Sequence, residues 1–169
     1  GANCEIADLD VIARLDRMCD DVGLDTIETG STIGVCMEAG KIPWGDGKAA
    51  IGLIEEMIAG TELGRLLGQG AFVAGKALGV KRIPTVKGQA MAAYDPRNLK
   101  GTGVTYATSP MGADHTAGLT LEAPIDPLSP LAQAAVSALM QTVSATADCF
   151  MCLFAWFSAA SPETMPELV

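Results

Sequence analysis

The stretch IADLDVIARLDRMCDDVGLDTIETGSTIGVCMEAG, residues 6–40, decides the fold. Its first half repeats apolar side chains at steps of three and four residues, the spacing of an amphipathic helix, and this helix is expected to end at Gly23. A second helix is expected to begin with Asp25 as its N-cap, with Glu28 in the capping-box position three residues later. The stretch therefore predicts two helices joined by a tight glycine turn.

The rest of the chain predicts further helices separated by glycines and prolines. The expected elements are helices over 45–60, 61–68 and 71–79, an ordered loop over 80–107, a helix over 131–145 and an apolar helix over 149–160. Strand-like alternation of useful length is not seen in the sequence. The fold class is therefore expected to be all-α and multihelical, with one helical subdomain over 1–79 and a second part, a loop followed by helices, over 80–169.

The composition indicates a globular protein and argues against two classes of partner. Of 169 residues, 49% are hydrophobic, which is enough for a substantial core, and 20 acidic against 11 basic side chains give a net charge of -9. That charge repels phosphate backbones and anionic membrane surfaces, so neither nucleic acid nor a membrane is expected as a partner. The sequence shows no signal peptide, and five cysteines are an odd number, so we expect a cytoplasmic protein with reduced thiols.

Two carboxylates flank the glycine turn of the DDVGLD segment. Asp20 and Asp25 stand five residues apart on either side of Gly23. The structural interpretation is a C-capping glycine followed by an Asp N-cap. The functional interpretation is that paired carboxylates bind a planar ligand rich in N–H donors, such as a pterin. Local pattern alone leaves both interpretations open.

Two other segments are candidates for chemistry. Cys149 and Cys152 form a CxxC pair, which is either two core thiols of an apolar helix or the source of one ligand to an iron–sulfur cluster. His115 is the only histidine, and it follows Asp114 in a loop marked by glycine and proline, where catalytic groups concentrate. A solvated or structural histidine is the alternative.

Several unusual strings occur in a fixed order along the chain. They are GANC at 1–4, DDVGLDTIETG at 20–30, GTELGRLLGQG at 60–70, VKGQAMAAYDPR at 86–97, GVTYATSPMGADHTAG at 103–118 and DCFMCLFA at 148–155. In this order they resemble the tungsten-containing aldehyde:ferredoxin oxidoreductase family. The resemblance covers nearly the whole chain, and it implies the multihelical fold of that family's helical domains.

The resemblance also implies roles for individual residues. Asp20, Leu24 and Asp25 match the family motif that holds one pterin of a metal bis-pterin cofactor. Cys152 matches the fourth cysteine ligand of a [4Fe–4S] cluster. His115 matches a histidine of the substrate pocket near the metal, which makes it the expected proton donor or acceptor.

A second pterin contact is implied near the cluster cysteine, from Asp148 and Met151. The chain departs from the family pattern here, because the family places an aspartate five residues before the cluster cysteine. Ala147 occupies that position and Asp148 follows it. A shift of one residue on a helix turns a side chain by about 100°.

The family implies an activity that needs more than this chain. The complete enzyme is expected to oxidise an aldehyde to a carboxylic acid at tungsten or molybdenum and to pass electrons to ferredoxin. The remaining part, an N-terminal cofactor-binding domain with a CxxCxxxC run, is not in the sequence, so we expect the chain alone to be inactive. A noncatalytic helical scaffold or partner-binding module is the alternative; a thioredoxin-like redox module is disfavoured because the sequence lacks a βαβ pattern.

Overall fold

The computed structural model describes residues 1–121, 123–149, 151–152 and 155. The chain forms two compact units, Gly1–Ala93 and Tyr94–Val169. The assignment of separate functional halves to 1–79 and 80–169 stays a prediction.

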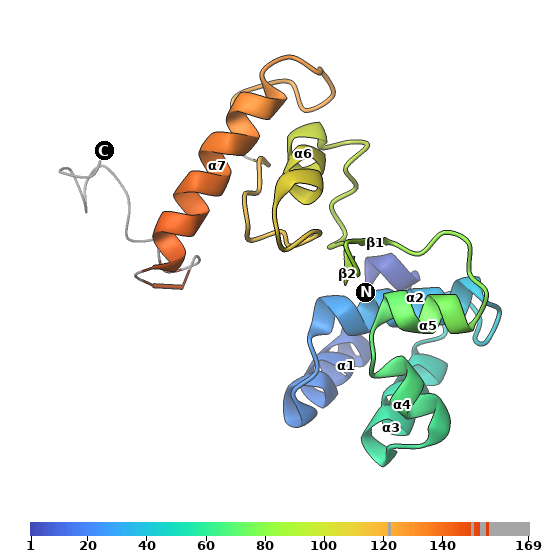
Figure 1. Ribbon diagram of the computed structural model, residues 1–169. Coiled ribbons are helices and arrows are strands. Elements are labelled where there is room, and N and C mark those ends of the chain that lie inside the picture. Colours follow the sequence, from blue (N-terminus) through green and yellow to red (C-terminus); the bar gives the residue numbers. More distant parts are fainter. Residues whose placement is uncertain (122, 150, 153–154, 156–169) are drawn as a thin grey trace. The chain divides into compact units, whose positions relative to one another are not determined.

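The first unit is a packed group of helices with one short hairpin (Figure 1). Its elements are η1 (Ala2–Cys4), α1 (Leu9–Val22), α2 (Thr26–Glu38), α3 (Gly47–Ala59), α4 (Glu62–Leu67), α5 (Ala71–Ala77), β1 (Thr85–Val86) and β2 (Gln89–Ala90). The two strands are antiparallel and pair Val86 with Gln89. The expected helices of this unit are confirmed.

The helix boundaries follow from side-chain caps. The side chain of Asp8 accepts hydrogen bonds from the backbone N–H groups of Asp10 and Val11, so α1 begins at Leu9, later than expected. Asp46 caps α3 in the same way through the N–H of Ala49. Each cap satisfies a backbone donor that has no partner inside its helix.

The core of the first unit lies between α1, α2 and α3. Its buried side chains come from all three helices and from the N-terminal segment, and they include Cys4, Leu15, Ile33, Cys36, Leu53 and Ile54. Helix α4 approaches α3 very closely at Gly64, where an added Cβ would lie 1.8 Å from the backbone oxygen of Glu56. Only glycine fits at that contact.

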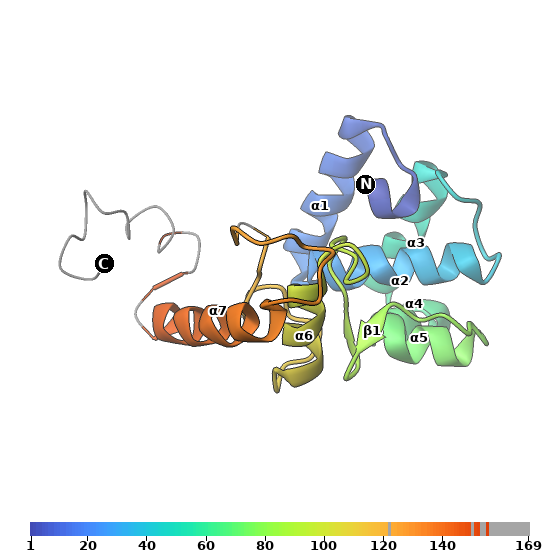
Figure 2. The ribbon, with the colours of Figure 1, turned by 90° about the horizontal axis from the view of Figure 1, so that it is seen from above.

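The second unit contains two packed helices, α6 (Lys100–Thr108) and α7 (Gln133–Asp148), which lie side by side in Figures 1 and 2. The expectation of a loop over 80–107 was wrong, because this range holds the β1–β2 hairpin and most of α6. Helix α6 packs through small and hydroxyl-bearing residues instead of an apolar stripe; its buried positions are Gly101, Thr102, Thr105 and Tyr106. Helical periodicity of hydrophobic side chains is therefore absent from it.

The end of α7 corrects a second expectation. The helix ends at Asp148, and Cys149 is exposed, so Cys149 is not a core residue. Most of the apolar helix expected over 149–160 lies outside the described residues. Within the part of the chain that the structure describes, no helix is long and apolar enough to cross a membrane.

Candidate functional site

The α1–α2 junction is a reverse turn with hydrogen bonds at the end of α1 and at the start of α2. Gly23 adopts φ 72°, a left-handed conformation, and its N–H donates to the carbonyl of Asp20 at 3.2 Å. The N–H of Leu24 donates to the carbonyl of Cys19 at 2.9 Å. Asp25 then caps α2, because its Oδ2 accepts from the N–H of Glu28 at 2.6 Å. The turn therefore fixes the backbone at Asp20, and the cap fixes the carboxylate of Asp25.

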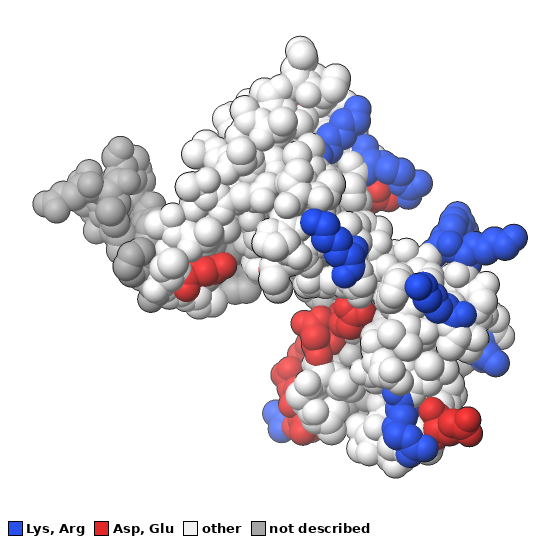
Figure 3. Space-filling view, in the orientation of Figure 1, with Lys and Arg blue, Asp and Glu red and all other residues white. Residues whose placement is uncertain are grey.

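Both carboxylates of the junction face solvent within the first unit. Asp20 and Asp25 are exposed, and Leu24 between them is half-buried. Figure 3 shows acidic side chains gathered over α1 and the start of α2. A carboxylate has about four acceptor positions, so Asp25 can cap its helix and still accept from a ligand. The junction can therefore bind a ligand with several N–H donors.

Glu28 anchors the junction to distant parts of the unit. Its Oε1 accepts from the N–H of Ala71 at the start of α5 (2.8 Å), and its Oε2 accepts from the N–H of Ala90 in β2 (2.9 Å). The expected capping box is therefore only half formed: Asp25 accepts from the N–H of Glu28, but the carboxylate of Glu28 accepts from Ala71 and Ala90. One carboxylate thus ties α2, which begins at Asp25, to both α5 and the hairpin.

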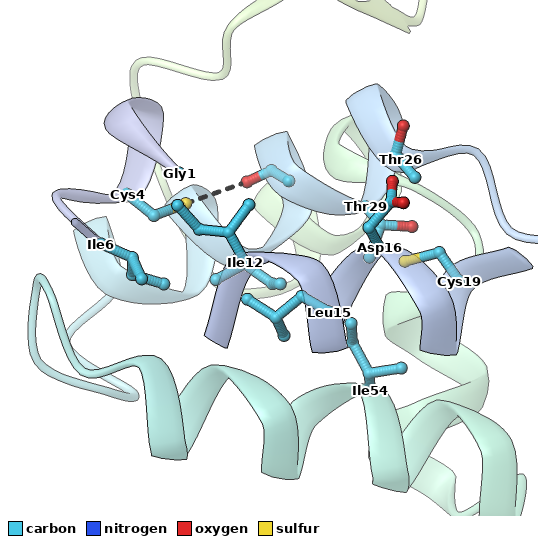
Figure 4. Close-up of a pocket in the computed structure, with 12 residues that line it drawn as sticks. Gly1, Cys4, Ile6, Ile12, Leu15, Asp16, Cys19, Thr26, Thr29 and Ile54 are labelled. Atoms are coloured by element: carbon cyan, nitrogen blue, oxygen red, sulfur yellow. Dashed lines mark hydrogen bonds between the residues drawn. The ribbon is translucent and has the colours of Figure 1, made fainter. Parts of the chain in front are cut away.

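A small cavity of about 120 Å³ lies beneath the junction (Figure 4). Its walls are mostly apolar, with Leu15, Ile33 and Ile54 among them, and Asp16 and Cys19 lie at one end. This mostly apolar lining offers few hydrogen-bond partners to a ligand rich in N–H donors. The exposed side of the junction, which carries the carboxylates of Asp20 and Asp25, suits such a ligand better.

The buried thiols of the first unit are poor nucleophiles. Burial raises the pKa of the Cys4, Cys19 and Cys36 thiols, and that of Cys36 reaches about 11. Cys4 donates its thiol hydrogen to the carbonyl of Gly30 at 3.3 Å. The thiolate is the reactive and metal-binding form, so these three cysteines act as packing residues.

In the second unit, His115 lies in the loop that follows α6. Its ring centroid is 6.0 Å from that of Tyr94, and the two ring planes are tilted by 45°. The neighbouring Asp114 accepts at Oδ1 from both the N–H and the hydroxyl of Thr116, at 2.8 and 2.7 Å. The half-buried His115 is therefore placed between an aromatic ring and a fixed turn.

Tyr106 of α6 reaches the same neighbourhood from inside the unit. Its side chain is 1% exposed, and burial raises its pKa to about 12, with smaller electrostatic contributions from Tyr94 and Asp114. The phenol therefore stays protonated through the neutral range. Among the described residues, its hydroxyl is the buried side-chain polar atom without a hydrogen-bond partner.

The segment before α6 contains a charged pair. Arg97 and Asp95 are joined by a bidentate interaction, with Nε of Arg97 2.9 Å from Oδ2 of Asp95. These hydrogen bonds lower the pKa of Asp95 to about 2. The guanidinium of Arg97 is therefore occupied by its neighbour Asp95.

The second acidic motif differs from the first in its local structure. Ala147 is fully buried, whereas Asp148 is exposed at the end of α7. Cys149 donates its thiol hydrogen to the carbonyl of Ala145 at 3.2 Å, and the N–H of Met151 donates to Ala147 at 3.0 Å. The position of the family's aspartate, which Ala147 occupies here, is therefore on the buried face of α7, and Asp148 one residue later is on the exposed face.

Cys152 is exposed and lies just beyond α7. Throughout the described residues, no group of three or more His, Cys, Asp or Glu side chains is arranged to hold a metal ion. A single exposed thiol suits a cluster whose other ligands come from elsewhere. Cys152 and His115 belong to the second unit, and the junction carboxylates belong to the first.

The family model described as aldehyde ferredoxin oxidoreductase, domains 2 and 3, matches residues 1–169. The chain belongs to this family. The expected family and the all-α fold are both confirmed.

Individual relatives support the same assignment. The chain is 35% identical over 130 residues to the tungsten-containing aldehyde ferredoxin oxidoreductase of Pyrococcus furiosus and 34% identical over 130 residues to that of Thermococcus kodakarensis. Each alignment covers 68% of this chain and 22% of the relative. It is also 30% identical over 144 residues to the aliphatic sulfonate oxidoreductase, WOR-like subunit, of Pyrococcus furiosus, covering 73% of this chain and 23% of that protein. The chain thus spans about a fifth of the length of these aldehyde ferredoxin oxidoreductase family members.

Two features of the site escaped prediction from sequence. The anchoring role of Glu28 depends on backbone groups 43 and 62 residues away. The burial of Tyr106 depends on the packing of α6, a helix that hydrophobic periodicity does not reveal. Of these two residues, only Tyr106 could have been noticed in the sequence, because it is the aromatic residue in a string of mostly small residues before His115.

Proposed function

We propose that this chain carries part of the cofactor and substrate site of a tungsten or molybdenum bis-pterin oxidoreductase that oxidises aldehydes to carboxylic acids. The observation that supports this most is the α1–α2 junction, where two exposed carboxylates flank a left-handed Gly23 in a member of the aldehyde ferredoxin oxidoreductase family. In this proposal the remainder of the same enzyme, with an N-terminal cofactor-binding domain, completes the site. Ferredoxin is the electron acceptor, and the enzyme works in the cytoplasm.

The residues at the junction fit a pterin. Asp20 and Asp25 offer carboxylate oxygens, which accept the ring N–H and amino hydrogens of a pterin, and Leu24 offers an apolar contact between them. The cap bond from Glu28 to Asp25 fixes one carboxylate oxygen before any ligand arrives. This preorganisation lowers the entropy cost of binding.

At the second motif, Cys152 is the proposed ligand to a [4Fe–4S] cluster. Its exposed position at the end of α7 allows three further cysteines from another part of the enzyme to meet it. Met151 and Asp148 are the proposed neighbours of the second pterin. Asp148 is exposed, as such a contact requires, although it stands one residue later than the family pattern.

The cofactor supplies the oxidation chemistry, and this chain supplies the proton transfer. In the proposed reaction His115 accepts or donates the proton that moves when the aldehyde is hydrated and oxidised, because imidazole titrates near neutral pH. Its contact with Tyr94 limits the rotation of the ring. Asp114 and Thr116 hold the backbone of the loop on which it sits.

His115→Gln in the complete enzyme tests this role. Glutamine keeps the size and polarity of the side chain but cannot transfer a proton near neutral pH, so kcat for acetaldehyde should fall by about 10²- to 10⁴-fold. Tungsten, pterin and iron contents should stay at the level of the unchanged enzyme. An unchanged kcat at full metal content contradicts the proposed role of His115.

A second substrate class has its own support. One relative is named an aliphatic sulfonate oxidoreductase, WOR-like subunit, and it aligns with 73% of this chain. Assaying the complete enzyme with acetaldehyde, benzaldehyde and an alkanesulfonate in parallel separates the two classes. Higher kcat/KM for the aldehydes supports the first proposal, and higher kcat/KM for the sulfonate replaces it with the second.

A further inference from the structure

The hydroxyl of Tyr106 differs from the other buried hydroxyls of α6 in its hydrogen bonding. Thr102 pairs with the hydroxyl of Thr120 at 3.1 Å, and Thr105 pairs with the hydroxyl of Ser137 at 2.8 Å. The buried hydroxyl of Tyr106 has no such partner among the described residues. A buried unpaired hydroxyl costs about 1–3 kcal/mol, and phenylalanine would fill the same space without that cost. A specific use for the hydroxyl is therefore needed.

The position of Tyr106 indicates what that use is. Tyr94 precedes α6 and the loop with Asp114 and His115 follows it, so α6 carries Tyr106 between two segments that meet at the Tyr94–His115 contact. Tyr94 and Asp114 both lie near enough to act electrostatically on the Tyr106 hydroxyl. Since the phenol keeps its hydrogen at neutral pH, it is available as a donor in a neighbourhood of acceptors.

Asp114 is the acceptor with capacity to spare. The two hydrogen bonds from Thr116 both go to Oδ1, so Oδ2 retains its ability to accept. Asp114 is half-buried in a loop, where its side chain can turn toward α6. A bond between a neutral donor and a carboxylate is stronger than one between neutral groups.

We propose that Tyr106 is a positioning residue whose hydroxyl donates a hydrogen bond to Asp114 and so fixes the loop that presents His115. The bond forms when Asp114 turns toward α6 in the complete enzyme, and it joins the interior of the second unit to the residue before the histidine. This inference rests on the proposed role of His115. Its structural part, the tie between helix and loop, is independent of catalysis.

Hydrogen–deuterium exchange of the complete enzyme tests the tie. In Tyr106→Phe, the backbone amides of residues 109–118 should exchange at least fivefold faster than in the unchanged enzyme. The unfolding temperature should fall slightly, because the substitution removes the proposed hydrogen bond to a carboxylate. The kcat should fall about tenfold at unchanged KM, since substrate contacts are kept while His115 is held less well.

Two further variants complete the test. Asp114→Ala should accelerate exchange in the same loop, and Tyr106→Phe combined with Asp114→Ala should exchange no faster than Asp114→Ala alone. Ser137→Ala is the control for loss of a buried hydroxyl in the same unit, and it should lower the unfolding temperature without the selective acceleration at 109–118.

The outcomes separate the two proposals. Unchanged loop exchange in Tyr106→Phe overturns the tie, and additive effects of the two substitutions overturn Asp114 as its acceptor. Faster exchange in Tyr106→Phe together with full activity in His115→Gln supports the tie and contradicts the proposed function of the histidine.

Discussion

The two segments expected to contact the cofactor, residues 20–25 and residues 147–152, differ in structure. The first, residues 20–25, is a helix–turn–helix junction in which Gly23 reverses the chain and Asp25 starts the next helix. The second, residues 147–152, follows the end of α7 without a glycine, and Cys149 continues in a right-handed helical conformation at φ −69°. In the first motif the leading aspartate is exposed, and in the second its place is taken by the fully buried Ala147.

The difference shows how the local backbone decides which carboxylates are exposed. At the first junction the caps place two carboxylates on exposed backbone turns, whatever ligand they bind. In the second segment, the packing of α7 determines which residue is exposed to solvent, and this residue is Asp148. The proposed role of the second segment therefore rests on Cys152 and not on a pair of carboxylates.

The largest expected effect concerns the cysteine of the second motif. In the complete enzyme, Cys152→Ser should abolish or severely reduce the [4Fe–4S] cluster, because a hydroxyl replaces a thiolate that bonds iron. Cys149→Ser is the matched control, since a serine hydroxyl can keep the existing bond to the carbonyl of Ala145. Iron and acid-labile sulfide are measured in both variants. Loss of the cluster in Cys149→Ser with retention in Cys152→Ser reverses the assignment.

The next effect concerns the one-residue offset. Ala147→Asp restores the aspartate of the family pattern but places a carboxylate at a fully buried position, which should lower the free energy of unfolding by roughly 3 kcal/mol or more. Asp148→Ala, at the exposed neighbour, should change it by less than about 0.5 kcal/mol. Urea denaturation of the chain measures both. Equal stability of the two variants would mean that α7 does not pack through Ala147.

A smaller effect concerns the turn of the first motif. Gly23→Ala should destabilise the chain by about 1 kcal/mol, because alanine is strained at φ 72° even though no atom lies within 4 Å of its Cβ. Gly52→Ala in α3 has the same open surroundings without the left-handed backbone, and it should stabilise the chain through helix propensity. A higher unfolding temperature for Gly23→Ala than for Gly52→Ala would contradict the turn assignment.

The sequence was informative where structure is decided locally. The end of α1 at Gly23 and the N-cap of α2 at Asp25 were predictable, because each uses residues within a few positions of one another. Helix α6 was missed, since Gly101 and Thr105 bury it without a hydrophobic stripe. The partners of Glu28 were beyond prediction, because they depend on how α5 and β2 return to α2.

The same distinction applies to the candidate site. The residues of the α1–α2 junction were found from the sequence, and their placement follows from local hydrogen bonds. Tyr106 was not found, because its importance comes from a missing partner that only a packed interior can reveal. The contact between Tyr94 and His115 likewise joins residues 21 positions apart that only tertiary packing brings together.

The central claim, that the first junction holds a pterin, is tested most directly by comparing two helix caps. Asp25 caps α2 and Asp8 caps α1, so replacing either by alanine removes a cap worth about 1 kcal/mol, and only Asp25 is proposed to bind the cofactor. The complete enzyme carrying Asp25→Ala should retain pterin and tungsten about 10- to 100-fold less tightly on dialysis, because charge-assisted hydrogen bonds worth roughly 1.5–3 kcal/mol are lost. Asp8→Ala should retain both in full. Equal pterin and metal contents in the two variants contradict the account.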